Sequence, residues 1–158
     1  MTAHAQLLQK VPVFGGIRED TLDFLLQKAK SLLLYKGDYL YKEGDKKLAM
    51  YVIERGEIAI LKNRKGQQYF LNQAGTGDSI GEMALFDLFP HSASTYALSD
   101  CQVLEISSKN LFEVYQKDLE QFALIQMNMG REVARRLRIS DQRLFEYQIK
   151  NELQEGNS

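Results

Sequence analysis

The sequence has 158 residues and a mass of 18.2 kDa, which is enough for one domain with a hydrophobic core. Its 20 basic and 21 acidic residues give a formal net charge of −1, so overall charge attracts the chain neither to nucleic acid nor to an anionic membrane. No segment approaches the roughly 20 apolar residues that cross a bilayer, and one cysteine, Cys101, excludes an internal disulfide. We expect a soluble cytoplasmic domain with Cys101 as a buried structural thiol.

The first 31 residues have the pattern of two short helices. Residues 5–10 form the first candidate, which ends before Pro12 because a proline disfavours helix in the residue before it. Residues 20–30 form the second candidate, because its apolar residues recur at helical spacing on one face: Leu22, Leu25, Leu26 and Ala29. We expect this helical lead-in, residues 1–31, to pack on the structure that follows.

Residues 32–106 change to short β-rich runs separated by glycine turns. The runs cover residues 39–41, 50–53, 58–61, 69–71 and 103–106. This spacing is typical of short antiparallel strands in a sandwich or barrel, and it predicts a β-roll of the jelly-roll type. Residues 63–66 read as a hairpin turn in which Gly66 supplies a positive φ, so Arg64 and Lys65 are interpreted as a solvated loop.

The chain after residue 106 is expected to be helical. Ser107 or Ser108 begins a short helix through Gln116, and residues 118–152 contain no proline and one glycine. Such a helix would be about 50 Å long, more than a small β-roll covers, so the expected partner is the same helix of a second chain. The alternative is a helix that folds back on its own roll. The expected seam has near-heptad spacing, with Gln126 filling a gap: Leu119, Phe122, Met129, Val133, Leu137, Ser140, Leu144 and Tyr147.

The predicted fold class is therefore α+β, mainly β: an antiparallel β-roll with N-terminal helices and a long C-terminal helix. We expect one domain over residues 1–158, divided into the lead-in (1–31), the β-roll (32–106), the short helix with the long dimerisation helix (107–153) and a tail (154–158).

The stretch 77–96 has the pattern of a ligand-binding loop. Gly77 and Gly81 allow tight turns that bring peptide N–H groups close to an anion. Glu82 opens a one-turn apolar segment that Pro90 closes, and its carboxylate offers two acceptor oxygens to hydroxyl groups. An anionic ligand that carries hydroxyls fits both features.

The run Gly81-Glu82-Met83-Ala84-Leu85-Phe86, followed by Pro90 and Ser92-Ala93, resembles the phosphate-binding cassette of the cyclic-nucleotide-binding domain family. In that cassette a glutamate at the position of Glu82 takes the ribose 2′-hydroxyl and an arginine takes the cyclic phosphate. Here His91 holds the arginine position. The resemblance implies these ligand-binding residues: Gly81, Glu82, Met83, Ala84, His91, Ser92, Ala93 and, on the long helix, Ser140.

The long helix carries a second resemblance. Residues 133–137, Val-Ala-Arg-Arg-Leu, look like the dimerisation helix of the catabolite-activator-like regulators, and this register places Ser140 where those regulators contact adenine. Those regulators add a winged helix-turn-helix, for which the residues after this helix are too few. We therefore expect a stand-alone sensor without DNA binding. Arg135 and Arg136, with Glu132 and Asp141 nearby, are interpreted as a solvated helix face.

His91 sets the expected affinity, because arginine offers a permanent planar charge to phosphate whereas histidine is half charged near pH 6.5. Loss of one partner in a buried charge pair costs about 2–5 kcal/mol. If His91 binds the phosphate by titrating, affinity should rise between pH 7.5 and pH 6. The alternative is that His91 faces solvent in a site without nucleotide.

These observations favour a non-enzymatic, dimeric sensor that binds cyclic AMP or a related cyclic nucleotide and signals to an effector protein. No cofactor, metal or membrane partner is expected, because only His4 and His91 are available as histidine ligands and no catalytic motif is recognisable. One alternative is an interaction module that keeps the fold and has lost the nucleotide. A third hypothesis is a different anion, such as a cyclic dinucleotide.

Overall fold

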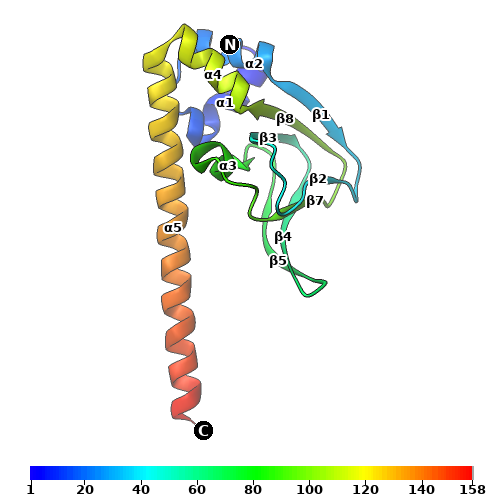
Figure 1. Ribbon diagram of the computed structural model, residues 1–158, viewed down its shortest axis with the longest axis vertical. Coiled ribbons are helices and arrows are strands. Elements are labelled where there is room, and N and C mark those ends of the chain that lie inside the picture. The colour runs from blue at the N-terminus through cyan, green and yellow to red at the C-terminus, as the bar shows by residue number, and fades with distance from the viewer. Residues whose placement is uncertain (158) are drawn as a thin grey trace.

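The computed structural model describes residues 1–157 as a β-roll with helices at one end and one long helix beside it (Figure 1). Ser158, at the end of the expected tail, lies outside the described residues. The elements in chain order are α1 (Ala3–Lys10), the 3-10 helix η1 (Pro12–Phe14), α2 (Glu19–Lys28), β1 (Lys30–Leu34), β2 (Tyr39–Tyr41), β3 (Ala49–Arg55), β4 (Ile58–Arg64), β5 (Gln67–Ala74), β6 (Ser79–Ile80), α3 (Glu82–Asp87), β7 (Ser94–Ala97), β8 (Cys101–Ser107), α4 (Ser108–Lys117) and α5 (Leu119–Gly156).

Two four-stranded antiparallel sheets make the roll, with strand orders β1-β8-β3-β6 and β2-β7-β4-β5. The predicted fold class is confirmed. Strand β3 is buried on both faces, as its alternating side chains require. Met50 and Val52 join the core under the helices, whereas Tyr51 and Ile53 join the core inside the roll. Cys101 belongs to the second core and is a buried free thiol, as expected.

The hairpin between β4 and β5 turns at Lys65 and Gly66, whose φ angles are 51° and 80°. Arg64 pairs with Gln67 across it. Two successive positive φ angles in a two-residue loop suit the right-handed twist of the strands, so the turn at residues 63–66 is confirmed. Seven of the eight residues of β5 are exposed, and only Ala74 is buried.

Side chains of α5 form hydrogen bonds with the lead-in. The buried amide of Asn128 donates from Nδ2 to the carbonyl oxygens of Val13, at 3.0 Å, and Gly15, at 2.8 Å. Gln121 Oε1 accepts a hydrogen bond from the backbone N–H of Arg18 at 2.8 Å. These bonds satisfy backbone groups of the irregular segment around η1, and they fix where α5 lies against that segment.

Helix α5 is continuous for 38 residues, which corresponds to about 57 Å. Asp118 caps it by accepting from the Gln121 N–H at 3.1 Å. The helix projects well past the roll (Figure 1), and residues 137–157 are all exposed. The alternative in which the helix packs on its own chain holds for the first half, where Ile125 and Met129 are buried, and not for residues 137–157. Placing Met129 in the dimer seam is wrong, because this side chain is fully buried in the chain's own core.

The short helix α4 begins with a capping box. The side chain of Ser107, rather than that of Ser108, accepts from the Asn110 N–H, and the Asn110 side chain accepts from the Ser107 N–H.

No helix within residues 1–157 combines the length and the apolar character needed to cross a bilayer.

Candidate functional site

Gly81 determines the path of the chain from β6 into α3. Its φ is +83°, and a Cβ at this position would lie 3.0 Å from the Ala49 carbonyl oxygen and 3.1 Å from His91 Cε1. A side chain would therefore be strained and crowded, so the position requires glycine. Helix α3 then runs for six residues, and Leu88 ends it in the left-handed region with φ 62°.

Glu82, the first residue of α3, is fully buried. Its Oε1 forms an ion pair with the guanidinium of Arg136 on α5. Its Oε2 has no hydrogen-bond donor within residues 1–157. Burial raises the pKa of this carboxyl because desolvation disfavours the charge, and Arg136 opposes that shift. The site thus contains a buried acceptor that a hydroxyl group would satisfy.

Arg136 makes three contacts, of which one is to Glu82 of the cassette, one is to strand β6 and one is within α5. Besides Glu82, its Nε lies 3.3 Å from Glu132 Oε1 and its Nη2 lies 3.2 Å from the carbonyl oxygen of Ser79. Its side chain is 40% exposed, but these contacts hold its guanidinium in place. The interpretation of Arg136 as part of a solvated helix face is wrong because it pairs with a buried carboxylate.

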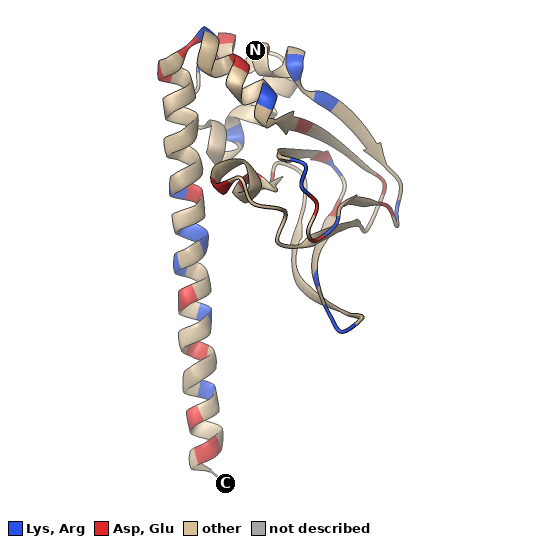
Figure 2. Cartoon of the chain, viewed as in Figure 1, with Lys and Arg blue, Asp and Glu red and all other residues tan. Residues whose placement is uncertain are grey.

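Glu132 is buried and is held mainly by the neighbouring Arg135. Arg135 Nη2 lies 2.6 Å from Oε1, and Arg135 Nε lies 3.1 Å from Oε2, so the contact is bidentate. The hydrogen bond from Arg135 lowers the pKa of Glu132. Farther along α5 both signs of charge are interspersed (Figure 2).

His91 is buried, with 4% of its surface exposed. Its ring stacks on Tyr41 with centroids 3.9 Å apart and planes 23° apart. Its Nε2 lies 2.8 Å from the carbonyl oxygen of Lys47, which only accepts, so Nε2 carries the proton. Burial lowers the pKa of His91, so the neutral form prevails near pH 7. The alternative in which His91 faces solvent is wrong.

Two adjoining cavities lie between the cassette, the roll and α5. We call the first, of about 220 Å³, the cassette cavity, and the second, of about 660 Å³, the helix cavity. Both are lined by Ile60, Ile80 and Arg136. Six of the residues predicted from the sequence line the cassette cavity: Gly81, Met83, Ala84, His91, Ser92 and Ala93.

The two other predicted residues lie next to these cavities. Ser140 lines the helix cavity, and Glu82 is joined to Arg136, which lines both. The sequence analysis missed Arg136. The signal that points to it is its spacing from Ser140, because residues four apart on a helix share a face.

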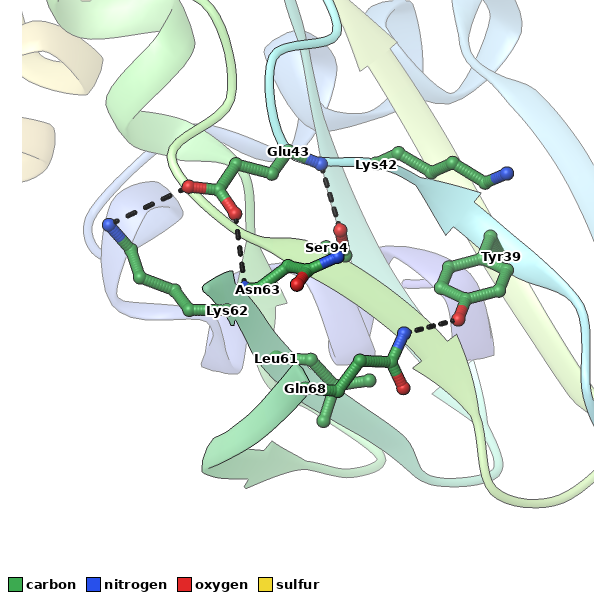
Figure 3. Close-up of a pocket in the computed structure, with 8 residues that line it drawn as sticks. All are labelled: Tyr39, Lys42, Glu43, Leu61, Lys62, Asn63, Gln68 and Ser94. Atoms are coloured by element: carbon green, nitrogen blue, oxygen red, sulfur yellow. Dashed lines mark hydrogen bonds and ion pairs between the residues drawn. The ribbon is translucent and has the colours of Figure 1, made fainter. Parts of the chain in front are cut away.

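A third cavity, of about 400 Å³, is lined by residues on or next to strands β2, β4, β5 and β7 and by none of the predicted site residues. Figure 3 shows that its polar groups bind one another. Glu43 accepts from the Asn63 N–H at 3.3 Å, its carboxylate lies 3.9 Å from Lys62 Nζ, and Gln68 Nε2 donates to the Tyr39 hydroxyl at 2.8 Å. These groups do not converge on an empty point as the groups of a ligand site do.

Comparison with known proteins agrees with this geometry. The model of the cyclic nucleotide-binding domain matches residues 32–118. The chain is 28% identical over 131 residues to a cyclic AMP receptor protein of Thermus thermophilus, an alignment that covers 82% of this chain and 59% of that protein. It is 32% identical over 107 residues to a cAMP-activated global transcriptional regulator of Salmonella typhimurium, covering 66% of this chain and 49% of the regulator.

Solved structures give the same result. The catabolite activator protein of Thermus thermophilus superposes with a TM-score of 0.74 at 28% identity, covering 84% of this chain and 61% of that one. The regulatory domain of Toxoplasma gondii PKA, solved with cAMP, has the same fold, with a TM-score of 0.67 at 22% identity over 70% of this chain and 42% of that one. The chain thus spans about half the length of the curated bacterial regulators it matches.

Proposed function

Because the chain belongs to the cyclic nucleotide-binding domain family, we propose that it is a non-enzymatic sensor that binds a cyclic nucleotide, cAMP, in the cassette and helix cavities. Glu82 carries this proposal. A buried acceptor without a donor costs about 1–3 kcal/mol, and Oε2 of Glu82 is such an acceptor. Its ion-pair partner Arg136 lines both cavities. A ribose hydroxyl supplies the missing donor. The names of the bacterial relatives support cAMP as the ligand.

The two cavities suit the two ends of such a ligand. The phosphate would lie in the cassette cavity, against the small residues Gly81, Ser92 and Ala93. The base would lie in the helix cavity, which has apolar walls from Ile60 and Ile80 and the Ser140 hydroxyl as a polar group. Bound in this way, the ligand would contact both the roll and α5.

We propose that the signal leaves through α5. A ligand that contacts both the roll and α5 can bind one relative arrangement of the two more tightly than another. This difference in affinity shifts the population toward the arrangement that binds the ligand better. The exposed apolar residues Leu137, Leu144 and Tyr147 would pair with the same helix of a second chain. The output of such a cytoplasmic homodimer would pass to an effector protein.

A second candidate function is a protein-interaction module that binds no nucleotide. Two contacts favour it: the His91 ring is already bonded to the Lys47 carbonyl, and the Glu82 carboxylate is already paired with Arg136. A nucleotide would have to compete with the Lys47 carbonyl for His91 and with Arg136 for Glu82. Under this candidate, Glu82→Gln would leave binding of the effector unchanged.

Calorimetric titration with cAMP and cGMP distinguishes the two functions. The sensor predicts saturable binding that Glu82→Gln weakens by about tenfold or more. The amide oxygen would stay with Arg136, so the amide NH2, a donor, would face the hydroxyl that needs an acceptor. Glu43→Gln, in the third cavity, is the matched control and should bind as the wild type does. Absence of heat up to millimolar nucleotide, from protein shown to contain no co-purified nucleotide, would favour the interaction module.

A further inference from the structure

Among the described residues that line the cassette cavity, the one permanent positive charge comes from α5. Four of these residues are ionisable: Tyr41, Asp87, His91 and Arg136. Burial raises the pKa of the Tyr41 phenol, which therefore stays neutral. Asp87 has the wrong sign for a phosphate, and the pKa of His91 is lowered by burial. The guanidinium of an arginine is a permanent cation. A phosphate in this cavity therefore has one fixed counter-charge, and it comes from the helix rather than from the cassette loop.

The two basic side chains also differ in the donors they have free. A guanidinium carries five N–H donors, and the contacts of Arg136 to Glu132, Glu82 and the Ser79 carbonyl occupy three of them. One N–H remains on each of Nη1 and Nη2. His91 donates a hydrogen bond from Nε2–H to the backbone carbonyl oxygen of Lys47. In this neutral ring Nδ1 is an acceptor, so it repels a phosphate oxygen.

The neighbouring charges leave Arg136 able to attract an anion. Glu132 is already neutralised by the bidentate contact with Arg135. Glu82 is the remaining partner, and its carboxyl has a pKa raised by desolvation. A hydroxyl that donates to Glu82 and a phosphate oxygen that accepts from Arg136 would together share the existing ion pair without breaking it.

We propose that Arg136 on α5 supplies the cation for the ligand's phosphate, and that His91 is a positioning residue that holds the cassette through Lys47 and Tyr41. This inference rests on the proposed function. Its consequence is a direct link between ligand and helix, because the phosphate binds α5 itself while the ribose hydroxyl binds Glu82 of the cassette. Ligand binding then tightens the contact between cassette and helix in one step.

The test compares cAMP with its cyclic phosphate methyl ester, which keeps the ribose and base but has no charge. Calorimetry should show the wild type preferring cAMP over the ester by at least tenfold. In Arg136→Gln, cAMP affinity should fall about 30-fold or more, and the preference for the charged ligand should disappear. Arg136→Lys should restore part of both. A merely structural role would weaken both ligands equally.

Matched controls separate the two residues and the two hypotheses. His91→Gln, which loosens the cassette, should weaken both ligands alike and keep the preference for cAMP. Arg138→Gln, at an exposed arginine on the same helix, should change neither affinity by more than about threefold. The proposal is overturned if His91→Gln abolishes the preference while Arg136→Gln retains it, or if Arg136→Gln weakens cAMP and ester alike. Wild-type protein that binds neither ligand would instead refute the proposed function, and this inference would fall with it.

Discussion

Arg136→Ala should destabilise the ligand-free protein in a pH-dependent way, because it leaves Glu82 buried without its counter-charge. Breaking a fully buried ion pair costs about 3–5 kcal/mol. Arg136 is 40% exposed, so solvent screens part of the pair. An unpaired buried group costs about 1–3 kcal/mol, and we expect a loss in this range at pH 7.5.

The sign of the pH dependence follows from the raised pKa of Glu82. A carboxyl whose pKa is higher in the folded state binds its proton more tightly there, so its protonation stabilises the folded protein. This contribution is fully present below the unfolded-state pKa of about 4.3. It is lost as the pH rises through the folded-state pKa. Removing Arg136 raises the folded-state pKa further, so the deficit grows with pH. At pH 5, only about 0.7 unit above the unfolded-state value, this group contributes less than about 1 kcal/mol.

Urea denaturation followed by circular dichroism at pH 5 and pH 7.5 measures this difference, at one protein concentration because a dimer would link stability to concentration. Arg138→Ala, an exposed arginine on the same helix, is the control and should change stability by less than about 0.5 kcal/mol. The double variant with Glu82→Gln should recover most of the loss. Equal destabilisation by Arg136→Ala at both pH values would refute the reasoning.

Three further predictions follow from other contacts. Gly81→Ala should lower the free energy of unfolding by about 1–3 kcal/mol in urea, because its φ is +83° and the new Cβ would lie 3.0 Å from the Ala49 carbonyl oxygen; an unchanged midpoint would contradict this. Asn128→Ala should cost a similar amount, about 1–3 kcal/mol, because the carbonyl oxygens of Val13 and Gly15 lose their donor; hydrogen exchange should show the loosening at residues 11–17, and protection as in the wild type would count against it. Leu144→Glu should convert the dimer into a monomer in analytical ultracentrifugation. It should not lower the urea midpoint for unfolding of residues 3–107, because the Leu144 side chain is 58% exposed in the single chain. A wild-type protein that is already a monomer would contradict the proposed dimer seam.

The sequence predicted those parts of the fold that depend on local pattern. The β4–β5 turn needs positive φ at Gly66, and the short runs with glycine turns suit antiparallel strands, so both were readable from neighbouring residues. The uninterrupted helix was predicted from the absence of proline. The sequence did not predict which face of α5 packs on its own chain. An apolar residue such as Met129 has the same helical spacing in a dimer seam as in a core.

The site was predictable as far as it follows one stretch of chain. Most of residues 81–93 line the cassette cavity. The pair of Glu82 and Arg136 joins residues 54 positions apart, and an arginine on a charged helix has no local feature that reveals a buried partner. The contact of His91 with the Lys47 carbonyl spans 44 positions, so the state of its ring could not be predicted from the sequence.

Hydrogen–deuterium exchange with and without cAMP tests the central claim, nucleotide binding between cassette and helix, most directly. The account predicts new protection at residues 79–93 and at residues 132–143 of α5, both lost in Glu82→Gln. Protection confined to residues 39–68 around the third cavity, or no change at millimolar cAMP, would contradict it.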